Sequence, residues 1–75
     1  MSQTKVAADL PAEELKIRIK KLNSKAGQMK MDLHDLAEGL PADYELLMDL
    51  ASRTYEVYQQ LQELKRLLKQ KDRNP

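Results

Sequence analysis

Two stretches of this 75-residue chain decide its fold: LKIRIKKLNSKAGQMKMDLHDLAEGL (residues 15–40) and LMDLASRTYEVYQQLQELKRLL (residues 47–68). In each stretch one set of positions recurs four and three residues apart without interruption. These positions are Leu15, Ile19, Leu22, Ala26, Met29, Leu33, Leu36 and Leu40, followed by Leu47, Leu50, Thr54, Val57, Leu61, Leu64 and Leu68. We call these fifteen residues the seam; only Thr54 among them is polar. A strict repeat of 3.5 residues places one narrow apolar stripe on each helix and predicts packing of the coiled-coil type.

The sequence therefore predicts an all-α fold, an antiparallel helical hairpin within a single domain at residues 10–71. The expected parts are a flexible tail (1–9), a first helix (about 11–38), a turn (39–43), a second helix (about 43–71) and a second flexible tail (72–75). Proline at position 11 and the acids after it suit the first turn of a helix, whose amino end carries positive charge.

The turn leaves more than one start open for the second helix. Gly39 is predicted to end the first helix, because glycine adopts a positive φ without a steric penalty. The second helix could then begin near Pro41, with Asp43 as its N-cap, or near Leu47. Within the first helix, Gly27 indicates either the close approach of another helix or a tolerated loss of helix propensity.

A single hairpin leaves half of each seam in water, so we expect a second copy to cover it. The chain has no cysteine and too few residues for a large core, which leaves oligomerisation as a means of stabilisation. The second helix also carries apolar residues beside its seam, which suits a helix with two neighbours. These residues are Tyr44, Leu46, Ala51, Tyr58 and Leu67. The expected assembly is a homodimer that forms a rod-like four-helix bundle.

The distribution of charge predicts how the two hairpins are oriented. Net charge is only +1, from 13 Lys and Arg against 12 Asp and Glu, so no general attraction to nucleic acid is expected. Residues 16–30 hold six cations and no anion, whereas residues 32–49 hold six anions and neither Lys nor Arg. Residues 65–73 are again basic, with five cations against one anion. A folded hairpin then has one positive and one negative end, which favours an antiparallel dimer with the turns at opposite ends.

The stretch from Lys30 to Pro41 (KMDLHDLAEGLP), followed by Arg53-Thr54-Tyr55 and preceded by Lys21-Leu22-Asn23, resembles a family of small two-helix proteins. This family is encoded in bacterial nitrogen-fixation gene clusters and is called Rop-like, after a plasmid RNA-binding protein with the same bundle shape. The resemblance covers about residues 12–70. It implies an antiparallel hairpin, a rod-like dimer, and an accessory role around nitrogenase or its cofactor assembly. It implies no known activity.

Three kinds of binding site can be considered from the residues. The outward residues Ile17 and Met31 on the first helix, with Tyr44, Met48, Tyr55 and Tyr58 on the second, are candidates for binding a partner protein or for assembling dimers into a higher oligomer. His34 and Glu38 are neighbours on one helix face and could hold a divalent cation weakly, although two ligands are too few for a tight site. The basic run of the first helix, joined to Lys65, Arg66 and Lys69 on the second, could meet RNA phosphates, but no aromatic residue for base stacking lies within the run.

These observations favour a protein–protein interaction module over an RNA-binding regulator or, third, a weak metal carrier. No pairing of a nucleophile with a base and no phosphate-binding loop can be argued from the sequence, so we predict no enzyme and no cofactor. No run of residues approaches a membrane span, and we expect a soluble, cytoplasmic protein. Thr54 is expected to set the register of the seam, or to return its hydroxyl to the carbonyl of Leu50.

Overall fold

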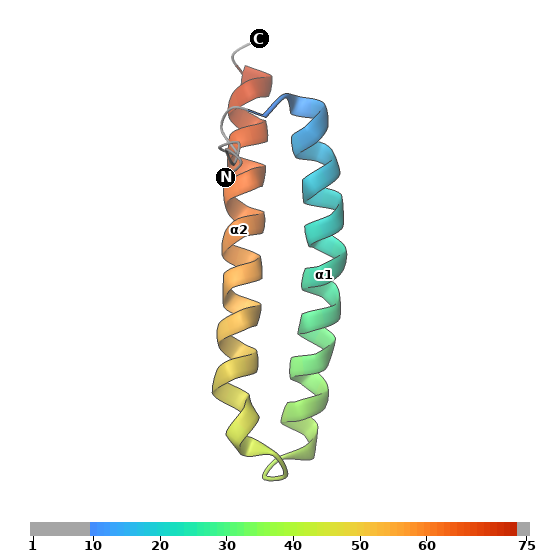
Figure 1. Ribbon diagram of the computed structural model, residues 1–75, viewed down its shortest axis with the longest axis vertical. Helices are drawn as coiled ribbons and strands as arrows, with labels where there is room; N and C mark the ends of the chain where they lie inside the picture. The colour runs from blue at the N-terminus through green and yellow to red at the C-terminus, as the bar shows by residue number, and fades with distance from the viewer. Residues whose placement is uncertain (1–9, 74–75) are drawn as a thin grey trace, which may run out of the picture.

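The computed structural model describes residues 10–73, which form two long helices that lie side by side and run in opposite directions (Figure 1). Helix α1 spans Ala12–Gly39, a short 3-10 helix η2 spans Tyr44–Leu46, and helix α2 spans Leu47–Arg73. No strand occurs in this part of the chain. The radius of gyration is 15.8 Å, whereas a compact domain of this length would have about 11 Å. The predicted all-α helical hairpin is confirmed, and it has the shape of a rod.

Helix α1 begins where the sequence favours a helix start. The N–H of Leu15 donates to the carbonyl of Pro11 at 3.0 Å, and two acids, Glu13 and Glu14, lie in the first turn. Each acid also faces a cation one turn later: Glu13 lies 3.9 Å from the Nζ of Lys16, and Glu14 lies 3.3 Å from the Nε of Arg18. These local pairs stabilise the first turns by a few tenths of a kcal/mol each.

The residue that takes the left-handed conformation in the turn is not the one that the sequence predicted. Gly39 remains helical, and no glycine within residues 10–73 has a positive φ. Asp43 instead adopts φ 57° and ψ 27°. The positive φ expected at Gly39 was therefore wrong, although α1 does end at this residue. An aspartate tolerates this conformation better than most residues, because its short polar side chain can bond locally to the backbone.

Helix α2 begins at Leu47, the latest of the starts that the sequence allowed. The N–H of Tyr44 donates to the carbonyl of Pro41 at 3.3 Å, and the N–H of Leu46 donates to the carbonyl of Asp43 at 3.0 Å. These bonds wind the chain into η2 before the wider helix begins, and the Asp43 side chain makes no capping hydrogen bond.

The far end of helix α2 also differs from the expected bounds. The helix continues through Asp72 and Arg73, which the sequence assigned to a flexible tail. The remainder of the two expected tails, residues 1–9 and 74–75, lies outside the described residues. Neither α1 nor α2 has a segment long and apolar enough to cross a membrane.

The core consists of two small clusters between the helices, one at the end of the rod away from the turn and one near its middle. The first cluster contains Leu10, Leu15 and Leu67, with Leu64 and Leu68 packed against it. The second cluster contains Ala26, Val57 and Leu61, with Ile19, Leu22, Met29 and Tyr58 packed against it. Leu15 is fully buried. Both helices contribute to each cluster, so the two clusters hold the hairpin closed.

The seam is buried unevenly along the rod. Five of its residues are buried (Leu15, Ala26, Thr54, Val57 and Leu61), whereas Leu40 is exposed and the others are intermediate. From residue 27 to residue 53 no side chain is buried, although Leu33, Leu36, Leu47 and Leu50 lie on the seam in this half. A dimer core made of all fifteen seam residues therefore stays a prediction. The single hairpin leaves part of the apolar seam uncovered, where a second copy could pack.

The one polar residue of the seam behaves as expected. The side chain of Thr54 is buried, and its Oγ1 donates to the carbonyl of Leu50 at 2.8 Å. This bond within one helix satisfies the hydroxyl without a partner from α1. The predicted hydrogen bond is confirmed, and Thr54 fits an apolar surface because its polar atom is already bonded.

Candidate interaction surfaces

Five of the six residues predicted to bind a partner are exposed in the structure: Ile17, Met31, Tyr44, Met48 and Tyr55. Ile17 and Met31 belong to α1, Met48 and Tyr55 to α2, and Tyr44 to η2. Met48 and Tyr55 are the most open of them, with 81% and 67% of their surface exposed. They are seven residues apart, which is two turns of a helix, so they lie on the same side of α2.

Tyr58 has a different position from the other five residues. It is half-buried against the second core cluster, and its hydroxyl lies 3.5 Å from the carbonyl of Ala26 on α1, to which it donates. This side chain links the two helices and can offer a partner only part of its ring. Tyr58 is thus mainly a packing residue. Its position beside the seam, unlike those of Met48 and Tyr55, already indicated this role in the sequence.

Exposed apolar side chains are concentrated near the turn. Leu40, Tyr44, Leu46 and Met48 are all exposed within nine residues of sequence. The chain around them is acidic, with six anions between residues 32 and 49. The turn end of the rod therefore combines apolar surface with negative charge, a combination suited to a partner with apolar and basic side chains.

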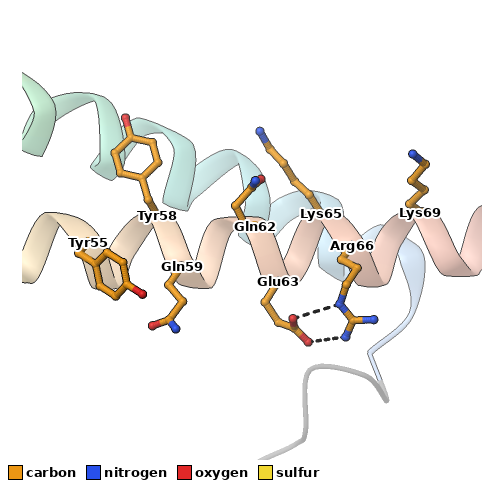
Figure 2. Close-up of a pocket in the computed structure, with 8 residues that line it drawn as sticks. All are labelled: Tyr55, Tyr58, Gln59, Gln62, Glu63, Lys65, Arg66 and Lys69. Carbon is orange, nitrogen blue, oxygen red and sulfur yellow. Dashed lines mark hydrogen bonds and ion pairs between the residues drawn. The ribbon is translucent and has the colours of Figure 1, made fainter.

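A second surface lies farther along α2 and forms an open groove with a volume of ≈ 750 Å³ (Figure 2). The groove is lined by Tyr55, Tyr58, Gln59, Gln62, Glu63, Lys65, Arg66 and Lys69. The sequence had marked the two tyrosines as candidates for binding a partner protein, and Lys65, Arg66 and Lys69 as possible contacts to RNA phosphates, but it had not marked Gln59, Gln62 or Glu63. The three- and four-residue spacing of the polar residues could have placed them beside the tyrosines, because such residues are neighbours on a helix surface.

Glu63 and Arg66 form a two-point ion pair in this groove. The Nε of Arg66 donates to Oε1 of Glu63 at 3.2 Å, and the Nη2 donates to Oε2 at 2.6 Å. Hydrogen bonding to Arg66 holds the pKa of the Glu63 carboxyl below its ordinary value, and the same bonds raise the pKa of the Arg66 guanidinium. The pair fixes both side chains on one side of the groove, where Figure 2 shows the dashed bonds between them.

His34 and Glu38 are brought together as the sequence predicted. The Nε2 of His34 lies 3.4 Å from Oε2 of Glu38, and both side chains are exposed. Within residues 10–73, no group of three or more His, Cys, Asp or Glu side chains is arranged to hold a metal ion. The arrangement is that of a surface ion pair, which forms when the imidazole is protonated.

Comparison with known proteins agrees with this fold. The Rop-like family model matches residues 11–73. A UPF0437 protein from Nostoc sp. strain PCC 7120, asl1434, is 72% identical over 57 residues, which is 76% of this chain and 80% of that protein. The UPF0437 protein of Trichormus variabilis is 66% identical over 62 residues, 83% of this chain and 72% of that protein. A relative in Frankia alni, described as a UPF0437 protein in the nifX-nifW intergenic region, is 49% identical over 55 residues, 73% of this chain and 67% of that protein.

A solved structure is also similar to this chain. It is the crystal structure of a DUF683-family protein from the cyanobacterium Cyanothece 51142, which superposes with a TM-score of 0.75 at 60% identity. The match covers 77% of this chain and 82% of that one. The family model spans almost all of the described hairpin, and the relatives match it closely along most of its length. The chain belongs to the Rop-like family, in which at least one relative is encoded between nitrogen-fixation genes.

Proposed function

We propose that this chain is a non-enzymatic protein–protein interaction module that acts as a homodimer in nitrogen fixation. Its partner would be nitrogenase or a protein that assembles the nitrogenase cofactor. The position of the Frankia alni relative in the nifX-nifW intergenic region supports the assignment to nitrogen fixation. The shape supports the role, because most side chains along the two helices are exposed and the volume beside α2 is an open groove, which offers little enclosed space for a substrate.

The observation that carries the homodimer is the uneven burial of the seam. Between residues 27 and 53 the seam residues Leu33, Leu36, Leu47 and Leu50 remain half-exposed, and no side chain in that half is buried. Each leucine that becomes fully buried stabilises an assembly by about 1.5–3 kcal/mol relative to leaving it exposed. A second hairpin laid along the seam would bury these leucines with those of its own seam.

The charges support an antiparallel arrangement of the two hairpins. The turn half carries the anions of residues 32–49, and the opposite half carries the cations of residues 16–30 and 65–73. With the turns at opposite ends, each acidic half lies beside a basic half. Each exposed ion pair contributes only about 0–1 kcal/mol, but every pair along the rod favours the same orientation.

The orientation can be tested with introduced cysteines, because the natural chain has none. Ala42→Cys places a thiol in the turn, and Gln70→Cys places one near the opposite end, both at exposed positions. Mixing the two variants under mild oxidation should give the mixed disulfide in preference to either self-pair. Sedimentation at equilibrium should give the dimer mass. Efficient self-pairing of Ala42→Cys would overturn the antiparallel arrangement, and a monomer at micromolar concentration would overturn the dimer.

Met48 and Tyr55 are the residues we assign to the partner, because both are strongly exposed and neither lies on the seam. The test is retention of nitrogenase subunits or cofactor-assembly proteins from a nuclease-treated extract of nitrogen-fixing cells, read by mass spectrometry. The double variant Met48→Glu/Tyr55→Glu should lose this retention and keep the dimer mass. The control Ser24→Glu/Gln70→Glu adds the same charge at exposed positions elsewhere and should retain the partner. If only nuclease-sensitive RNA is retained from untreated extract, the interaction-module proposal is wrong.

A further inference from the structure

We propose that the groove on α2 between Tyr55 and Lys69 binds an acidic amphipathic helix of a partner protein. The inference rests on the proposed function, because it specifies the chemistry of the protein that the module binds. It uses a different part of α2 from the turn-proximal residue Met48, since most of the groove lies more than one helical turn beyond Tyr55.

The shape of the groove suits a helix. Figure 2 shows Tyr58, Lys65 and Lys69 on one side of α2, and Tyr55, Glu63 and Arg66 on the other. Side chains three and four residues apart form ridges on a helix, and a second helix packs its own ridge into the groove between them. The groove is open to solvent rather than enclosed, so a helix can reach it from outside the hairpin.

The charge of the groove favours an acidic occupant. Glu63 is already bonded to Arg66 through both of its oxygens. Lys65 and Lys69, by contrast, take part in none of the ion pairs formed among residues 10–73. None of the groove residues lies on the seam, so this face stays outside the apolar contact of the proposed dimer. Like charges four residues apart repel each other on a helix, so two carboxylates from a partner would relieve this repulsion.

The spacing of the groove residues specifies the pattern of the partner. Tyr58 and Lys65 are seven residues apart, which is about 10 Å along a helix, and Lys65 and Lys69 are about 6 Å apart. An antiparallel partner helix would place one carboxylate beside Lys69 and a second carboxylate, four residues later, beside Lys65. An apolar side chain seven residues after the second carboxylate would then meet Tyr58. This direction places the acids toward the amino end of the partner, where the helix dipole favours negative charge.

A protein helix suits the groove better than RNA. The lining between the tyrosines and the lysines is made of Gln59, Gln62 and Glu63. Binding of a phosphate backbone needs a run of cations, whereas this groove offers two lysines without an ion pair among the described residues, beside two glutamine amides, which can donate to and accept from another protein. At its other end, the exposed ring of Tyr55 and the exposed part of the Tyr58 ring supply apolar surface for a leucine.

The test uses two synthetic helical peptides of identical composition and the full chain labelled with ¹⁵N. The matched peptide carries Glu at positions 4 and 8 and Leu at position 15 of an 18-residue alanine- and glutamine-based helix. In the control peptide both Glu residues are moved by two positions, which turns them by about 200° to the opposite face. At about 0.15 M salt, we expect amide shifts confined to residues 55–69 and binding about fivefold tighter for the matched peptide.

The variant Lys65→Gln/Lys69→Gln should weaken binding of the matched peptide about fivefold, as expected for two exposed ion pairs. The variant Lys20→Gln/Lys21→Gln removes the same charge from exposed positions of α1 and should bind as the natural chain does. Circular dichroism should show that both variants keep their helices. The proposal would be overturned if neither peptide binds, if both bind with equal affinity, or if the amide shifts lie outside the groove. It would also be overturned if a uridine oligonucleotide competes more strongly than excess unlabelled matched peptide.

The two proposals fail in different ways. If the peptides do not bind but Met48→Glu/Tyr55→Glu still abolishes retention of nitrogen-fixation proteins, the groove proposal is wrong and the interaction module stands. If the matched peptide binds as expected but the chain retains no nitrogen-fixation protein, the groove is an acidic-helix site and the proposed function is wrong.

Discussion

Replacement of Gly27 by alanine should stabilise the hairpin, because the site is open. Gly27 lies in the middle of α1, and a Cβ atom built on it would meet no other atom within 4 Å. Glycine inside a helix costs about 0.8–1.0 kcal/mol relative to alanine. We therefore expect Gly27→Ala to raise the free energy of unfolding by about 1 kcal/mol, which corresponds to an increase in Tm of about 4–8 °C for a domain of this size.

The assay is urea and thermal unfolding followed by circular dichroism, with all variants at one protein concentration because a dimer makes Tm depend on concentration. Ser24→Ala, one turn earlier at an exposed position of the same helix, is the matched control and should give about half the gain. If Gly27→Ala instead destabilises the protein while Ser24→Ala stabilises it, another helix lies against Gly27 in the assembly. The reasoning that this side of α1 faces solvent would then be wrong.

Three further outcomes follow from the structure. Leu61→Ala removes a buried leucine from the second core cluster and should cost about 2–5 kcal/mol, which urea unfolding measures. Asp43→Ala should be less stable than Asp43→Gly by about 1 kcal/mol, because the residue has φ 57° and glycine alone adopts that conformation without a penalty. Arg66→Gln should raise the pKa of Glu63 back toward its ordinary value of 4.5, as read by an NMR titration of the carboxyl. Because folding lowers this pKa, the stabilisation by the pair is present above 4.5 and is lost as the pH falls through the lowered pKa.

The hairpin could be predicted from the sequence because the seam repeat depends on many residues at once. A single polar residue such as Thr54 does not disturb that repeat, and its bond to Leu50 could be predicted because the partner lies four residues away on the same helix. Interactions of this range are set by helix geometry alone. The acidic half and the basic half of the rod could likewise be predicted, because they follow from the order of the charged residues along the chain and from the hairpin fold.

The turn and the groove could not be predicted in the same way. Gly39 and Asp43 both tolerate a left-handed conformation, and the choice between them depends on how far α1 extends before the chain reverses. Helix spacing places Gln59, Glu63 and Arg66 near the tyrosines, and it allows the ion pair between Glu63 and Arg66. These side chains are polar and exposed, as on any solvated helix face, so their spacing alone does not distinguish a groove from ordinary surface.

The absence of any buried side chain between residues 27 and 53 has a consequence for the lifetime of the protein in a cell. A hairpin without a second copy would open from the turn, because the two clusters that hold it closed lie near the middle of the rod and at its far end. Amide hydrogens near Leu36 and Leu50 would then exchange quickly in dilute solution and slowly in concentrated solution, whereas those near Leu61 would change less. Proteases cut open segments first, so unassembled chains would be degraded ahead of assembled ones. The amount of this protein would thereby follow the number of completed assemblies.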